Sequence, residues 1–140
     1  MEPAARDHFA DEWAALLARA ERDDALAKVH HPHYPAIMGP LVRAAAASSL
    51  ARFPPYISMF LLRFDGPLCN NLPPPVSIGV AAGPARYLVW WGQAFSRLER
   101  ATIVQETTDP HEAVALAELL LRNWPFPYEL RRPPARSRPA

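Results

Sequence analysis

Three histidines near residue 30 form the most noticeable polar group in the chain. They are His30, His31 and His33, and Pro32 stands between the last two. Imidazole titrates near neutral pH, so these side chains can act as a base, an acid or a metal ligand. A metal would need further ligands at fixed geometry, and no Cys or carboxylate stands at ligand spacing nearby. We take His31 and His33 as candidate catalytic residues without a metal; a solvated loop and metal binding are the alternatives.

An arginine and a glutamate form the second candidate pair. Arg63 stands among apolar residues, and a buried guanidinium needs an acidic partner, which Glu106 or Glu99 could supply. Such a pair is either a structural ion pair or part of a carboxylate-binding site. Arg63 and Glu106 are therefore the other two candidate catalytic residues.

Aromatic residues concentrate in one predicted strand. Tyr87, Trp90 and Trp91 stand there, and Tyr34 follows the histidines. Neighbouring residues of a strand point to opposite faces, so we expect one tryptophan in the core and the other on the outer face. An outer tryptophan favours a ligand surface or a dimer interface. Tyr34, Tyr87, Trp90 and Trp91 are thus candidate substrate-binding residues, and a homodimer is expected.

Several function classes find no positive support in the sequence. It lacks the GxGxxG, P-loop, HExxH, CxxC and GxSxG motifs, so we expect no cofactor. Cys69 is the single cysteine, which excludes an internal disulfide and fits a reducing cytoplasm. The acidic, amphipathic N-terminus is unlike a signal peptide, and no apolar run approaches the roughly 20 residues of a membrane span.

The net charge of +1 hides an uneven distribution. Four of the 15 basic residues lie in the Arg- and Pro-rich segment 131–140, which leaves 11 basic residues against 14 acidic ones. The rest of the chain has no basic surplus, so a nucleic-acid partner is not expected.

Proline-rich breaks divide the first half of the chain into helical segments. Prolines number 17 among the 140 residues, over twice the usual ~5%. An apolar stripe with a period of 3.6 residues predicts a helix over residues 3–28. A second helix is expected to begin at Pro35 or Pro40 and to end at Ala51.

Four strands are expected to follow, over residues 56–64, 76–81, 85–92 and 101–107. The first is apolar on both faces, which indicates a central strand. Its alternation places Ser58, Leu62 and Phe64 on one face and Ile57, Leu61 and Arg63 on the other.

The last helix has the clearest start signal. Asp109 stands at the N-cap position, Pro110 at the first helical position and a glutamate three residues after the cap, while Pro125 stops the helix. The order predicts an α+β fold with two N-terminal helices, a four-stranded antiparallel meander and a C-terminal helix packed on the sheet. We expect one domain over residues 1–128 and a disordered tail over 129–140.

Four segments carry a family resemblance. Residues 33–42, 53–58, 62–64 and 108–116 resemble, in order and spacing, small bacterial proteins of unknown function found in natural-product biosynthesis gene clusters. That setting implies peptide tailoring, a role similar to that of the lysinoalanine synthases of lanthipeptide pathways. Where relatives often carry a His after the serine equivalent to Ser58, this chain has Met59.

The leading hypothesis is a cofactor-free accessory protein that binds a peptide or similar natural product and helps to tailor or crosslink it. Such chemistry needs little beyond orientation of the substrate and one proton acceptor. The alternative is a non-catalytic protein-interaction or immunity-like binding module that uses the same aromatic surface.

Overall fold

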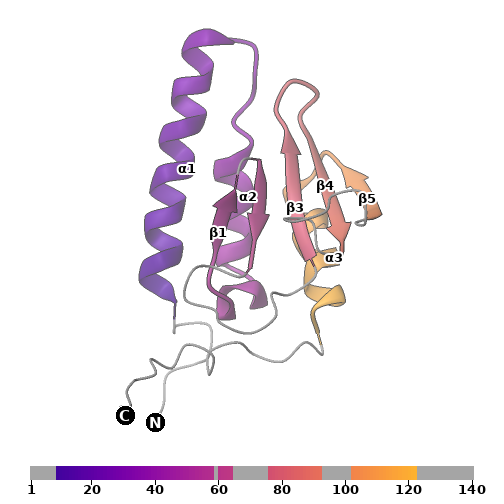
Figure 1. The fold of residues 1–140 in the computed structure, drawn as a ribbon. Helices are drawn as coiled ribbons and strands as arrows, with labels where there is room; N and C mark the ends of the chain where they lie inside the picture. The colour runs from indigo at the N-terminus through magenta and orange to yellow at the C-terminus, as the bar shows by residue number, and fades with distance from the viewer. Residues whose placement is uncertain (1–8, 59, 65–75, 93–101, 123–140) are drawn as a thin grey trace, which may run out of the picture.

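The computed structural model describes residues 9–58, 60–64, 76–92 and 102–122, and within them the chain forms a layer of helices against an antiparallel sheet (Figure 1). The elements in chain order are α1 (Ala10–His30), α2 (Met38–Ala46), the 3-10 helix η2 (Ser49–Arg52), β1 (Tyr56–Ser58), β2 (Leu61–Arg63), β3 (Val76–Ala81), β4 (Arg86–Trp91), β5 (Thr102–Thr107) and α3 (Pro110–Leu120). The predicted α+β class is confirmed.

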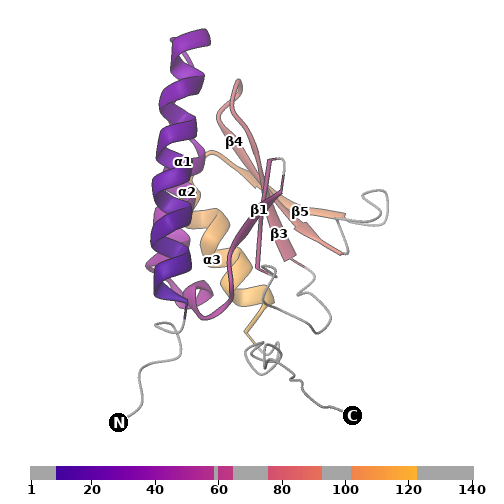
Figure 2. The ribbon, with the colours of Figure 1, turned by 60° about the vertical axis from the view of Figure 1, so that its left-hand side comes forward.

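The described strands form one sheet in the order β1-β2-β3-β4-β5, with every neighbouring pair antiparallel. Figure 2 shows the helices together on one side of this sheet. Cross-strand register aligns Ile57, Leu62, Ile78 and Val89 in a row that is almost fully buried. This row is the sheet's contribution to the core, because it faces the helices.

Residues 56–64 correct the sequence prediction, because they form a hairpin instead of one central strand. Ser58 pairs with Leu61 and Tyr56 with Arg63, so the chain reverses between them and β1 lies at the sheet edge. The sheet therefore has five strands in the described residues, where four were expected. A continuous apolar run suits a buried strand and a short hairpin equally well, so periodicity cannot distinguish them.

The reversal also exchanges the two faces of the segment. Paired residues of antiparallel strands share a face, so Ser58 lies on the same face as Leu61 and Arg63. Leu62 and Phe64 share the core face with Ile57, and all three are buried. The alternation predicted for an unbroken strand thus holds only up to the turn.

The other predicted strands and the first helix agree with the structure, with small shifts at their ends. The helical stripe is buried at Phe9, Trp13, Leu16 and Ala20. The indole Nε1 of Trp13 donates a 2.9 Å hydrogen bond to the backbone carbonyl of Phe53. This bond fixes α1 against the end of η2.

The second helix is shorter than predicted. α2 ends at Ala46, and Ser48 then caps η2 by accepting a 3.0 Å hydrogen bond from the Leu50 amide. Serine competes with the helical backbone for hydrogen bonds, which explains why the helix does not continue to Ala51.

The last helix begins as predicted. The Asp109 carboxylate accepts a 2.9 Å hydrogen bond from the His111 amide, and Pro110 occupies the first helical turn. Glu112 does not complete a capping box in the expected way; it accepts a 2.5 Å hydrogen bond from the hydroxyl of Thr107. The predicted stop at Pro125 lies outside the described residues, as do segments 1–8 and 129–140.

Within the described part of the chain, no helix has both the length and the apolar character needed to cross a membrane.

Candidate functional site

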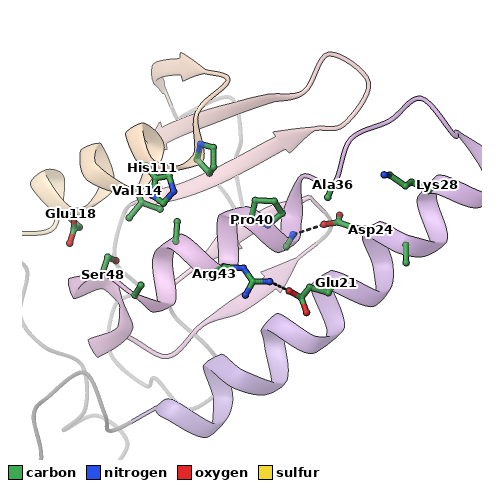
Figure 3. A pocket seen from close by; sticks show the side chains of 15 residues that line it. Glu21, Asp24, Lys28, Ala36, Pro40, Arg43, Ser48, His111, Val114 and Glu118 are labelled. Carbon is green, nitrogen blue, oxygen red and sulfur yellow. Dashed lines mark hydrogen bonds and ion pairs between the residues drawn. The ribbon is translucent and has the colours of Figure 1, made fainter.

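A pocket of about 810 Å³ lies over α2, with α1 on one side and α3 on the other (Figure 3). We call it the three-helix pocket. Its floor comes from the start of α2 and the residues around it, namely Ala36, Gly39, Pro40, Ala44 and Ala47. The floor is low because these side chains are small, while the flanking helices project on either side.

The walls carry the polar groups. On α1 they are Glu21, Asp24 and Lys28, and on α3 they are His111 and Glu118. Ala25 of α1 and Val114 of α3 add apolar surface between them. Most of the pocket surface is therefore apolar, with charged groups around it.

Asp24 joins the first wall to the floor. Its carboxylate accepts hydrogen bonds from the backbone amides of Met38, at 3.2 Å, and Gly39, at 2.7 Å. The N-cap residue of α2, Ile37, offers no side-chain acceptor, so Asp24 from α1 performs the capping role across the helix pair. A Cβ atom on Gly39 would lie 3.0 Å from Asp24 Oδ2, so glycine allows this close approach.

The remaining two acidic residues of the walls are also engaged. Glu21 forms an ion pair with Arg43 of α2. Glu118 accepts hydrogen bonds from the backbone amide of Ser49, at 2.9 Å, and from its hydroxyl, at 2.8 Å. These contacts connect all three helices that border the pocket.

The same contacts fix how the helices run. Glu21 meets Arg43 while Asp24 meets the start of α2, so α1 runs antiparallel to α2. Glu118, late in α3, meets Ser49 beyond the end of α2, so α3 runs parallel to α2. Lys28 and His111 consequently lie at the end of the pocket where α2 and α3 begin.

The histidines predicted as catalytic lie outside this pocket. His31 ends α1, and its ring stacks on that of Tyr34 with centroids 4.3 Å apart and an interplanar angle of 12°. The Tyr34 hydroxyl lies beside the β3–β4 turn, 3.4 Å from where a Cβ on Gly83 would stand. His33 is exposed in the same connection. The stacked pair therefore fastens the connection to the hairpin.

Arg63 and Glu106 have other neighbours than each other. The Arg63 guanidinium lies 5.6 Å from the ring centroid of Tyr56, its cross-strand neighbour. Glu106 pairs with Arg86 at 3.6 Å. β3 and β4 separate the strands that carry Arg63 and Glu106, and the other suggested partner, Glu99, lies outside the described residues.

The two tryptophans lie on opposite faces, as expected. Trp90 is on the outer face, where its indole Nε1 would stand 3.3 Å from a Cβ added to Gly79. It shares a cross-strand row with Arg63, Ser77 and Ile103. Trp91, on the helix-facing side at the end of β4, is 40% exposed. Neither tryptophan is fully buried, so the expected core tryptophan of this strand is absent.

Tyr87 corrects the expected set of substrate-binding residues. Only 3% of it is exposed, and its hydroxyl donates a 2.8 Å hydrogen bond to the carbonyl of Ile37. Burial, with smaller contributions from the charges of Asp24 and Asp109, raises the pKa of Tyr87 to about 12. The side chain connects the sheet to the start of α2 and belongs to the core.

The predicted catalytic residues are not brought together. His31 follows α1, in the helix layer, while Arg63 and Glu106 point to the other side of the sheet. Among the residues that the structure describes, no group of three His, Cys, Asp or Glu side chains could hold a metal ion. The pocket was missed in the sequence because its floor consists of alanine, glycine and proline; its one signal was the alanine run at 44–47.

Comparison with protein-family models, with curated protein sequences and with solved structures finds no match to this chain.

Proposed function

We propose that this protein binds an apolar peptide segment in the three-helix pocket. The observation that carries the proposal is the pocket itself: about 810 Å³ between two helices, over a floor of small side chains. Ligand pockets usually measure roughly 300–1,000 Å³ and are lined mostly by apolar groups with a few polar ones.

The pocket shape suits a helical guest. Small residues on a helix let a second helix approach to an axis separation of about 8–10 Å, and the floor of the pocket offers Gly39, Ala44 and Ala47. An amphipathic helix laid in such a groove is recognised through apolar side chains three and four residues apart. α1 and α3 would then flank the guest as they flank α2.

Peptide binding is a step that both sequence-derived hypotheses share. A peptide-tailoring protein must hold its substrate, and an interaction module must hold a segment of its partner. The bacterial natural-product setting comes from the sequence resemblance alone and stays a proposal, as do the tailoring step and the homodimer.

The test fills the pocket and measures binding. A displayed library of random peptides of about 14 residues, roughly 21 Å long as helices, is selected against the wild-type protein. Two variants then place an indole in the pocket from different helices, Ala47→Trp on the floor and Ala25→Trp on α1. Selected peptides should bind the wild type and lose at least about tenfold in affinity for both variants, because the added ring occupies the guest's space.

A matched control keeps this result specific. Ala15→Trp adds the same ring on an exposed part of α1 away from the pocket and should leave affinity unchanged. Circular dichroism and urea unfolding establish that each variant is folded. If no peptide is enriched, or if the enriched peptides bind both pocket variants as tightly as the wild type, the proposal is wrong.

A further inference from the structure

The charged groups around the three-helix pocket differ in whether they are already engaged. Glu21 is paired with Arg43, Asp24 holds two backbone amides, and Glu118 holds the amide and hydroxyl of Ser49. A positively charged group on a guest would have to compete with these contacts. Removing Asp24 or Glu118 from its backbone partners would also leave helix-terminal amides unsatisfied.

The cationic side is different. Lys28 and His111 line the end of the pocket where α2 and α3 begin, and both are exposed. Among the described residues, neither side chain has a hydrogen bond or ion pair. The nearest wall carboxylate to Lys28 along α1, that of Asp24, is directed to the amides of Met38 and Gly39. A guest anion at this end would meet donors that are available.

We propose that the peptide bound in the three-helix pocket is acidic at one end of its apolar stretch. Its carboxylates meet Lys28 and His111, and its apolar side chains lie over Pro40, Ala44 and Ala47. This inference rests on the proposed function, since it names the chemistry of the guest in that pocket. It also orients the guest, because the acidic end must lie where α2 and α3 begin.

The test uses peptides selected from the same library of about 14 residues. Enriched sequences should carry Asp or Glu beside the apolar stretch. A synthetic copy of the most enriched peptide is compared with a copy in which each acidic residue is replaced by its amide. The amide copy should bind about fivefold more weakly for each exposed ion pair lost, and the difference should shrink at high salt.

Variants of the protein assign the contact. In Lys28→Glu combined with His111→Gln, the acidic peptide should lose its advantage over the amide copy. Lys28 is the only lysine of the chain and is exposed, so its replacement should not perturb the fold. Arg22→Glu is the matched control, because Arg22 is an exposed cation of α1 that does not line the pocket.

Each failure has a distinct meaning. Enriched peptides without acidic residues that still lose affinity for Ala47→Trp would overturn this inference and leave the proposed function standing. An acidic preference that survives in the double variant would also overturn it. If no peptide depends on the pocket, both proposals fail. If the wild type self-associates and Ala47→Trp makes it monomeric in sedimentation, a second copy occupies the pocket and the inference is wrong.

Discussion

Tyr87 illustrates how a single side chain can be assigned the wrong role by sequence alone. Its place in an aromatic strand suggested a binding surface, yet its hydroxyl is used inside the molecule, on the carbonyl of Ile37. Aromatic residues with a polar tip serve cores and surfaces equally well when the tip finds a partner. Alternation alone could not decide between these, because both faces of the strand carry aromatic residues.

Tyr87→Phe should show this buried role in the pH dependence of stability. The pKa of Tyr87 is about 12 in the folded state, against 10.0 for an ordinary tyrosine. The phenol therefore stabilises the fold fully below pH 10, and this contribution is lost as the pH rises from 10 towards 12. Between those values the wild type should lose on the order of 2 kcal/mol more than Tyr87→Phe.

Urea unfolding of both proteins over this pH range provides the measurement. At pH 7 the variant should be less stable by about 1 kcal/mol, because the Ile37 carbonyl loses its donor. Tyr56→Phe is the control, since Tyr56 is 40% exposed, and it should retain the wild-type alkaline slope. Equal slopes for the wild type and Tyr87→Phe would contradict the assignment.

Elements were predicted well where a local signal marks their ends. The last helix announces itself through Asp109 and Pro110, and the β3–β4 hairpin through its short connection containing Gly83. The 56–64 segment lacks such a marker, so its reversal between Ser58 and Leu61 could not be predicted. Likewise, no local pattern shows that α2 receives its cap from another helix, 14 residues upstream of Met38.

Asp24→Ala tests this capping between elements. The substitution removes the acceptor for two amides at the start of α2, so the free energy of unfolding should fall by about 1–2 kcal/mol. The neighbouring Asp23→Ala is a matched control. Asp23 contacts Arg19 in an exposed pair at 3.7 Å, and its loss should cost less than about 0.5 kcal/mol. Equal losses in urea unfolding would show that Asp24 contributes no more than a surface charge.

At the scale of the whole molecule, two different surfaces compete for the role of binding site. One is the three-helix pocket; the other is the outer face of the sheet, where the row of Arg63, Ser77, Trp90 and Ile103 runs across four strands. The sequence pointed to the second because tryptophan and arginine are conspicuous residue types. The first depends on how three helices pack, and small side chains give no chemical signal of a cavity.

Amide NMR of the labelled protein during titration with the selected peptide tests the central claim most directly, because it maps both surfaces in one experiment. Our account predicts the largest shift changes around the pocket, at Ala25, Ala44 and Val114, and their loss in Ala47→Trp. Largest changes at Ser77, Trp90 and Ile103, with the pocket amides unmoved, would contradict it and assign binding to the sheet.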